Sequence, residues 1–542
     1  MKKLAILLCL VLLMAVPVSV QAEEEKDAFQ GIGVVHTQSG DVSGVLGATE
    51  DVTVFKGVPY AAAPVGELRW AEPQDHEGWE GVRVCDTYAA AAMQPSYTNF
   101  LMKPGSDFYP AGAPAQSEDC LYLNITTPAI SADEKLPVMV WFHGGGLSHG
   151  YSWQVPFDGE KLASKGVIVV TVGHRLGVMG FLSLPQLTAE SEYGASGNYG
   201  LMDCIKSIEW VHENIAAFGG DPEKVMVFGQ SGGGAKTLGT VAAPQTQGMV
   251  SCFSTQSSFG IFSGSGSNMG MATLKDNEET GLKLLDALGV SRDATLEELR
   301  AIPAEKIYSV SEAAGGAMVI DGKYITSERA DFYLGEGNLD GVAMMAGWVF
   351  GEKGSYEATD AADLYGKLRE KYGDLVDKYD LENTFPITDS NVGYYNYLLK
   401  QDEALDEIRL YAKLKAEKNE NSPSYIYSFG RVTPNKSLGW HSGELWYMFN
   451  NMGYSFEGMD AEWQPAWEVY DYMVGETTSS YWTNFAGNDD PNAPGLVNWP
   501  AADAENQPYQ YIDVVTTTFD ELTTFDQMVM EYYSNLYKLN EN

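Results

Sequence analysis

The chain has 542 residues, of which 44% are hydrophobic, and its formal net charge is −40, because 74 acidic residues stand against 34 basic ones. Such a charge repels polyanions at long range, so nucleic acid is excluded as an expected partner. No CxxC motif and no cluster of histidine with cysteine occurs in the sequence, and we therefore expect neither a metal ion nor a cofactor.

The N-terminus has the three parts of a secretory signal peptide. A basic start at residues 1–3 precedes an apolar run at 4–16 and a small-x-small pattern that ends at Ala22. The apolar run is too short to span a bilayer, and no later stretch approaches the roughly 20 apolar residues of a transmembrane helix. We expect cleavage after Ala22, export to the periplasm or the extracellular space, and no membrane attachment of the mature protein. Residues 23–542 show no compositional break and are predicted to form one domain.

Disulfide status and oligomeric state stay open at the level of sequence. Cys85, Cys120, Cys204 and Cys252 remain after cleavage of the signal, and an exported protein can form disulfides. Their wide spacing does not identify pairs.

Strand and helix patterns alternate along the first half of the chain. Continuous apolar runs at 137–142 and 167–172 are typical of strands buried on both faces of a sheet. Apolar residues then recur at helical spacing from Leu201 to Ile215, before another apolar run at 224–229. This alternation predicts an α/β fold with a large, mostly parallel sheet and helices on both faces. Shorter strand patterns precede these runs at 33–37, 40–46, 52–57 and 121–126.

The second half of the chain adds helices and further strands. Residues 276–288 have a helical pattern that Gly289 would end, and a second helix begins where Thr295 and Glu298 have the spacing of a capping box. We interpret these helices as an inserted lid or cap. The remaining predicted elements are a buried strand at 342–347, a largely helical region at 361–418, a last core strand at 424–429 and a final helix at about 525–539.

A G-x-S-x-G motif at residues 229–233 predicts a nucleophile. It follows the apolar run at 224–229 and precedes a segment that can form a helix. In such an elbow, serine is held on a sharp strand-to-helix turn, and flanking glycines avoid collision with the neighbouring backbone. Ser231 is therefore the candidate nucleophile.

A serine nucleophile needs a base, which is usually histidine. In α/β hydrolases the chain order is serine, acid, histidine. Of the seven histidines, only His441 lies beyond Ser231, and it is in a loop just after the strand predicted at 424–429. His441 is therefore the candidate base.

The acid should follow an intermediate strand, where it can orient the imidazole and stabilise its charged form. Glu352 fits best, because it comes shortly after the strand predicted at 342–347. Glu357 and Asp360 are alternatives that lie further from the strand end.

Acyl transfer also requires hydrogen-bond donors for the developing oxyanion. Residues 143–146 form a His-Gly-Gly-Gly sequence directly after the apolar run at 137–142. Residues without side chains let backbone N–H groups approach a carbonyl oxygen, so this segment is the candidate donor loop.

Taken together, these motifs resemble the type-B carboxylesterases, which include cholinesterases, bacterial para-nitrobenzyl esterases and the non-enzymatic neuroligins. The resemblance covers nearly the whole mature chain and implies an α/β-hydrolase fold. By position it implies Ser231 as nucleophile, Glu352 as acid and His441 as base. It also implies the backbone N–H groups of Gly145, Gly146 and Gly232 as oxyanion donors. The matching stretches are 55–61, 64–69, 117–124, 143–146, 175–182, 197–201, 218–222, 224–234, 438–445, 482–486 and 490–492.

The chain departs from the family pattern in three places. Gln230 and Gly232 flank the nucleophile where the family usually has Glu and Ala. Gly351 and Lys353 flank the acid where the family usually has Asp and Gly. The family disulfide would join Cys120 to a cysteine at the position that Ala92 occupies.

These features predict a secreted serine ester hydrolase whose expected partner is a small-molecule substrate, a small to medium carboxylic ester. Broad short-acyl esters and aryl or hydroxycinnamoyl esters are competing substrate classes. Trp348, Trp440 and Trp446, near the acid and the base, would line an aromatic pocket or pack in the core. The alternative from another class is a non-catalytic binding protein on the same fold.

Overall fold

The computed structural model describes residues 29–539, except 96–105, 107, 109–113, 262–270, 315, 336–338, 340, 419–420 and 454–464. The predicted signal peptide at 1–22 lies outside the described residues. It stays a prediction, which N-terminal sequencing of the exported protein would check. None of the helices in the described ranges has an apolar stretch of the length needed to cross a membrane.

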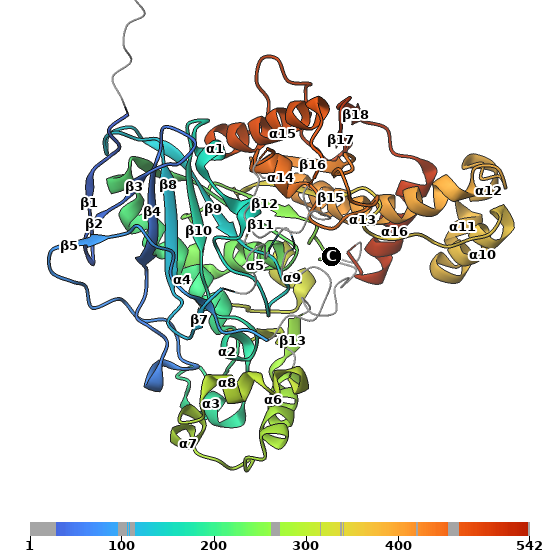
Figure 1. Cartoon of the computed structure of the whole chain (residues 1–542). Helices are drawn as coiled ribbons and strands as arrows, with labels where there is room; N and C mark the ends of the chain where they lie inside the picture. Colours follow the sequence, from blue (N-terminus) through green and yellow to red (C-terminus); the bar gives the residue numbers. More distant parts are fainter. Residues whose placement is uncertain are drawn as a thin grey trace, which may run out of the picture.

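A twisted sheet of eleven strands forms the centre of the molecule (Figure 1). The seven neighbouring strands β10, β9, β11, β12, β15, β16 and β17 run parallel to one another. Antiparallel strands flank them at both edges of the sheet. The predicted large, mostly parallel sheet is therefore confirmed. In sheet order the strands are β3 (Val45–Leu46), β4 (Thr53–Pro59), β8 (Tyr122–Thr127), β10 (Ile168–Val172), β9 (Leu136–Phe142), β11 (Gly220–Gln230), β12 (Cys252–Gln256), β15 (Ala343–Val349), β16 (Ser424–Phe429), β17 (Tyr509–Ile512) and β18 (Thr517–Phe519).

Helices cover both faces of this sheet, because its strands alternate apolar side chains between two cores. In β9, Val138, Val140 and Phe142 belong to one core, while Met139 and Trp141 belong to the other. The first core lies under α4 (Tyr199–Asn214), α5 (Gly232–Ala242), α13 (Val392–Glu417) and α16 (Thr524–Leu536). The second lies under α1 (Glu160–Ala163), α14 (Leu445–Met448) and α15 (Val469–Asn488).

Inserted helices project from the sheet domain in two groups (Figure 1). The capping box at Thr295 is present, and Gly289 ends a helix with φ of 68°, as predicted. One group contains α3 (Pro185–Glu190), α6 (Leu274–Leu288), α7 (Leu296–Arg300) and α8 (Ala304–Tyr308), and the other α10 (Ala361–Tyr372), α11 (Leu375–Lys378) and α12 (Leu381–Thr384). The other short helices are α2 (Gly177–Phe181), α9 (Arg329–Leu334), η1 (Gly66–Leu68), η3 (Val155–Phe157), η4 (Ile215–Phe218), η5 (Pro244–Thr246) and η6 (Ser311–Ala313).

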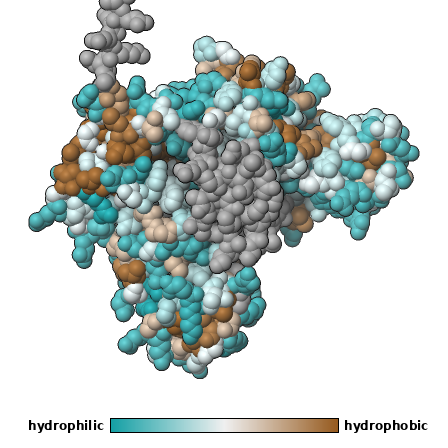
Figure 2. All heavy atoms as spheres, viewed as in Figure 1, coloured by the Kyte–Doolittle hydropathy of each residue, from teal (hydrophilic) through white to brown (hydrophobic). Residues whose placement is uncertain are grey.

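Three small sheets complete the described fold. They are β1 (Val34–Thr37), β2 (Gly40–Ser43) and β5 (Val82–Val84); β13 (Met271–Thr273) and β14 (Met318–Ile320); and β6 (Ala91–Ala92) and β7 (Gln116–Ser117). Figure 2 shows a mostly hydrophilic surface, with a hydrophobic area over the first of these sheets. Val34, Val82 and Val84 are exposed there.

Two strands in the parallel part of the large sheet, β12 and β17, were not predicted, and the prediction that 424–429 is the last core strand is wrong. β12 was missed because its buried residues Ser254, Thr255 and Gln256 are polar. β17 extends the sheet beyond β16, and its alternating tyrosine and glutamine residues lack the continuous apolar pattern of the central strands. Both strands were missed because polar residues occupy buried positions in them.

The cysteines among the described residues, Cys85, Cys120, Cys204 and Cys252, are buried and form no disulfide with one another. Burial raises the pKa of the Cys85 thiol to about 11. Ala92 and Cys120 line the same small cavity, so the position that would hold a disulfide partner is close but lacks a thiol.

A buried ion pair ties the loop after β10 to α4. The backbone N–H and Nε of Arg175 both donate to Asp203 Oδ2 at 2.9 Å, and Nη2 donates to Oδ1 at 2.7 Å. The two side chains are only 3% and 0% exposed. Removing one partner of such a pair leaves an uncompensated charge in the core.

We predict that Asp203→Asn lowers the free energy of unfolding by about 3 to 5 kcal/mol, because the Arg175 guanidinium loses its countercharge. Thermal unfolding followed by circular dichroism measures the effect. Asp286→Asn is the control, since the Asp286–Arg292 pair is exposed and its loss should leave the transition unchanged. Equal midpoints for Asp203→Asn and the wild type would contradict the prediction.

Candidate active site

Ser231 lies on the corner between β11 and α5, as the motif predicts. Its backbone has φ of 56° and ψ of −125°, a region that residues with side chains rarely adopt. The Ser231 N–H donates to the carbonyl oxygen of Gln256 at 2.8 Å, which ties the corner to β12. The strained turn therefore places the side chain at the carboxyl edge of the parallel strands.

Glycines around the corner let three backbone segments touch. An ideal Cβ on Gly233 would lie 2.0 Å from the carbonyl oxygen of Phe142, and one on Gly229 would lie 2.5 Å from the carbonyl group of Gly233. A Cβ on Gly232 would lie 1.9 Å from the carbonyl oxygen of Gly146. Glycine is therefore required at these positions for α5 to approach the loop after β9.

The candidate donor loop turns immediately after β9. Gly145 and Gly146 have φ of 90° and 65°. The carbonyl oxygen of Gly145 accepts from the N–H groups of His149 at 3.0 Å and Ser148 at 3.4 Å. In the described part of the chain, the N–H groups of Gly145 and Gly146 have no acceptor. The N–H of Gly232, at the first turn of α5, has no acceptor within its helix.

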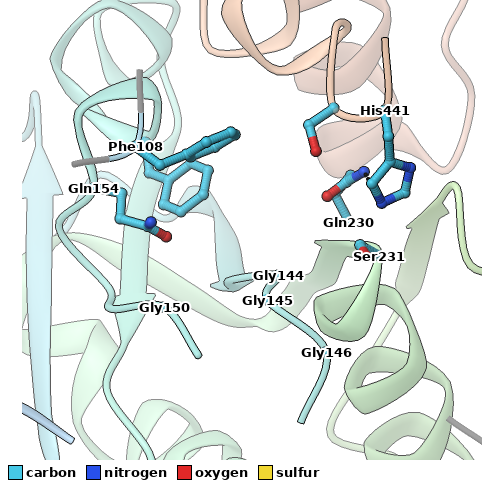
Figure 3. Close-up of a pocket in the computed structure, with 11 residues that line it drawn as sticks. Phe108, Gly144, Gly145, Gly146, Gly150, Gln154, Gln230, Ser231 and His441 are labelled. Carbon is cyan, nitrogen blue, oxygen red and sulfur yellow. Dashed lines mark hydrogen bonds between the residues drawn. The ribbon is translucent and has the colours of Figure 1, made fainter. Parts of the chain in front are cut away.

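His441 brings its two ring nitrogens to different partners. Nδ1 lies 2.5 Å from Oε2 of Glu352, and Nε2 lies 3.3 Å from the amide nitrogen of Gln230. Because that amide nitrogen can only donate, Nε2 carries the lone pair and Nδ1 the proton. No hydrogen bond joins His441 to Ser231 within the described residues, although both line one side of the same cavity (Figure 3).

Glu352 is held in a polar environment behind the imidazole. Its Oε1 accepts from the backbone N–H of Val349 at 2.7 Å and from the Ser257 hydroxyl at 2.6 Å. The side chain is only 3% exposed. Of the alternatives, Glu357 is exposed, and Asp360 caps α10 by accepting from the N–H of Asp363 at 2.9 Å. The structure therefore brings Glu352, and neither alternative, to His441.

Two polar residues at this site were not found from the sequence. Ser257 directly follows β12, and recognising that strand would have placed it beside the acid. Glu444, three residues after His441, is fully buried. Burial, with a smaller contribution from Glu352, raises the pKa of Glu444 to about 8, so this second carboxyl group is largely protonated at neutral pH.

The pKa of His441 is raised above its ordinary value. Burial disfavours the charged ring, but the adjacent Glu352 carboxylate outweighs burial by charge and by hydrogen bonding. An imidazole with a carboxylate on Nδ1 and a lone pair on Nε2 can accept a proton at Nε2.

The space beside Ser231, counted together with its part that is open to solvent, is about 610 Å³, and its lining is mainly apolar. The rings of Phe108 and Phe157 form one wall, with centroids 6.2 Å apart, and Gln154 lies beside them (Figure 3). His441 is the one titratable side chain among the described lining residues, which are Phe108, Gly144, Gly145, Gly146, Gly150, Gln154, Phe157, Gln230, Ser231, His441 and Ser442.

The tryptophans near the acid and the base do not line this cavity in the described structure. Trp446 is 2% exposed and packs in the core under α14 and α15. Trp348 is 4% exposed, and the Lys353 ammonium lies 3.2 Å from its ring centroid. The aromatic wall comes instead from Phe108 and Phe157, and none of its described residues belongs to the inserted helices α6 to α8.

No group of three or more His, Cys, Asp or Glu side chains within the described ranges is arranged to hold a metal ion.

Similar proteins were found at the level of family, sequence and structure. The carboxylesterase family model matches residues 32–409 and 356–530. The fumonisin B1 esterase of Sphingopyxis macrogoltabida is 33% identical over 90% of this chain and 86% of its own length. The para-nitrobenzyl esterase of Bacillus subtilis is 31% identical over 89% of this chain and 94% of its own length.

A solved structure of a PNB esterase superposes with a TM-score of 0.72 and 27% identity, over 92% of this chain and 99% of that protein. The fold is thus that of an α/β hydrolase. By family match, sequence relatives and structural neighbours alike, the chain belongs to the carboxylesterase family.

Proposed function

We propose that the chain is a secreted carboxylester hydrolase that works through an acyl-Ser231 intermediate, with Glu352, His441 and Ser231 as a catalytic triad. One observation carries the proposal. His441 Nδ1 lies 2.5 Å from the buried Glu352 carboxylate, while the same ring and Ser231 line one cavity. This is the arrangement that activates a serine hydroxyl.

In the proposed reaction, His441 Nε2 takes the Ser231 proton as Oγ attacks the ester carbonyl carbon. For this step, the hydrogen bond from the Gln230 amide to His441 Nε2 must break when substrate binds, because the Ser231 hydroxyl needs the same lone pair. The N–H groups of Gly145, Gly146 and Gly232 would then stabilise the oxyanion.

Collapse of the tetrahedral intermediate expels the alcohol, which receives its proton from His441. A water molecule then repeats the sequence on the acyl-enzyme, with His441 again as base, and releases the carboxylic acid and free Ser231. The Glu352 carboxylate, held against Nδ1, stabilises the transient imidazolium in both steps.

The cavity lining supports neutral esters as substrates. Phe108 and Phe157 offer apolar and aromatic contacts, and the described lining has no charged side chain other than His441 when it is protonated. The mainly apolar lining suits a small to medium acyl group, and an aryl or hydroxycinnamoyl group would stack on the two phenyl rings.

The binding-protein alternative is less well supported, because recognition alone requires neither a buried carboxylate on the imidazole nor a serine in a strained turn. Family membership does not decide between the two, since a fold carries unrelated functions.

We predict that the wild type hydrolyses p-nitrophenyl acetate and butyrate and aryl esters faster than long-chain acyl esters, and that Ser231→Ala loses all of these activities. The alanine variant should keep the wild-type circular dichroism spectrum, because its side chain adds no bulk to the turn. An organophosphonate should label the wild type at Ser231 and leave the variant unlabelled. Unchanged turnover in Ser231→Ala would refute the nucleophile assignment.

We predict that Glu352→Gln lowers kcat/KM by several orders of magnitude, because the neutral amide no longer stabilises the imidazolium or fixes its tautomer. In the wild type, kcat/KM should rise with pH through a limb above pH 6.5, since His441 must be neutral to act as base and its pKa is raised. Loss of the Glu352 charge should move that limb to lower pH.

Glu357→Gln is the matched control for this prediction, because Glu357 is exposed in the same loop. It should keep both the rate and the position of the acid limb. A large loss in Glu357→Gln with little change in Glu352→Gln would show that the acid was wrongly chosen.

A further inference from the structure

Lys236 is a buried lysine that the proposed mechanism does not use. It lies on α5, five residues after Ser231, and is 0% exposed. No carboxylate pairs with it in the described part of the chain. Burial lowers the pKa of its ammonium to about 8. A buried charge without a counterion is costly, so its polar contacts call for an explanation.

The Lys236 ammonium donates to an imidazole in the loop after β10. Its Nζ lies 3.1 Å from Nε2 of His174, and His174 Nδ1 lies 3.3 Å from the carbonyl oxygen of Arg175. An ammonium has no lone pair, so Nε2 of His174 must accept and its proton must be on Nδ1. Lys236 therefore determines the tautomer and the orientation of this ring.

His174 in turn fixes the first residue of the donor loop. The rings of His143 and His174 stack with centroids 4.6 Å apart and an interplanar angle of 10°. His143 Nδ1 lies 2.9 Å from the carbonyl oxygen of Gly144, and only a protonated Nδ1 can donate to that oxygen. Both histidines are at most 1% exposed, so the column is shielded from bulk solvent.

The column ends at the peptide whose N–H group, that of Gly145, is a proposed oxyanion donor. Every described peptide bond is trans, and in a trans peptide the C=O and the next N–H point in opposite directions. Holding the carbonyl of Gly144 against His143 therefore aims the N–H of Gly145 away from that ring. The carbonyl of Gly145 is held by the His149 N–H in the same manner, which aims the N–H of Gly146.

We propose that Lys236 is a positioning residue, which acts through His174 and His143 to hold the Gly144–Gly145 peptide in the orientation that stabilises the oxyanion. This inference rests on the proposed ester hydrolysis and deepens it. Lys236 touches neither substrate nor the reacting atoms. Its contribution is made when negative charge develops on the carbonyl oxygen, so it should appear in kcat and not in ground-state binding.

Among the described residues around Lys236, none is placed to replace the ammonium. Besides the two histidines, Lys236 is influenced by the Cys204 thiol on α4, whose pKa is raised by burial and which is therefore neutral. Asp203, the neighbouring residue of α4, already accepts hydrogen bonds from Arg175 and does not pair with Lys236. Loss of the lysine would thus leave His174 Nε2 buried without a donor.

The test compares Lys236→Met with the wild type. We expect kcat for p-nitrophenyl butyrate to fall about 10- to 100-fold, while KM changes less than about threefold. This loss of kcat is at most similar to that caused by removing one oxyanion donor altogether. The inhibition constant of a trifluoromethyl ketone, whose adduct bears an oxyanion, should rise by a factor similar to the loss in kcat. The p-nitrophenol burst gives the concentration of active enzyme in each sample.

Thr237→Val is the matched control. Thr237 is the next residue of α5, is 0% exposed, and its hydroxyl has no partner in the described residues, so the variant removes a buried polar group outside the column. It should keep wild-type kcat and inhibitor affinity. Equal losses in Thr237→Val and Lys236→Met would show a general packing effect and overturn the proposal.

A double-mutant cycle with His143→Phe tests whether the lysine acts through the column. If it does, Lys236→Met should cause little further loss of kcat in the His143→Phe background. Fully additive losses would overturn the proposal. So would a Lys236→Met enzyme with kcat and inhibition constant within twofold of the wild type.

A measurement on the wild type covers the case in which Lys236→Met does not fold. Long-range ¹H–¹⁵N NMR should show His143 and His174 as neutral rings protonated at Nδ1, even at pH 6, and a charged or Nε2-protonated His174 would overturn the proposal. Absence of ester hydrolysis in the wild type would instead refute the proposed function, so the two failures are distinguishable.

Discussion

The site depends on direct contact between two pieces of backbone. The first residue of α5 packs so closely on the loop after β9 that a Cβ on Gly232 would lie 1.9 Å from the carbonyl oxygen of Gly146. A Cβ on Gly233 would collide in the same way with the end of β9. This contact brings Ser231 and the N–H groups of the donor loop to one point. It also accounts for the glycine that follows Ser231, where the related pattern has alanine, since alanine would push this loop away.

The polar groups behind the serine depend on neighbouring parallel strands that end at one edge. The corner follows β11, Ser257 follows β12, Glu352 follows β15 and His441 lies in the loop after β16. Ser257, Glu352, His441 and Gln230, the last residue of β11, form one hydrogen-bonded chain, and Ser231 lies beside it at the same cavity. Glu444 is buried beside this chain, and burial, with a smaller contribution from Glu352, raises the pKa of its carboxyl group.

The Lys236 ammonium is a buried cation on the other side of the turn that carries Ser231. The Lys236 ammonium and the Glu352 carboxylate belong to separate hydrogen-bond networks, one reaching the donor loop and the other the base. Both networks end in an imidazole whose lone pair and proton are assigned by its neighbours. Side-chain hydrogen bonds thus set the direction of backbone N–H groups and of the Nε2 lone pair, two features that a cavity shape alone does not control.

Short-range patterns in the sequence determined the fold class, the strand-to-helix corner at Ser231, the glycine donor loop and His441 as the base candidate, because each depends on residue types close together or on chain order. Only the tertiary structure decided the rest. Polar β12 is recognisable as a central strand only from its pairing. Ser257 contacts Glu352 across 95 positions, and Lys236 contacts His174 across 62. Such partners are chosen by sheet order and by the burial of polar groups that must find hydrogen bonds, and neither is encoded in local periodicity.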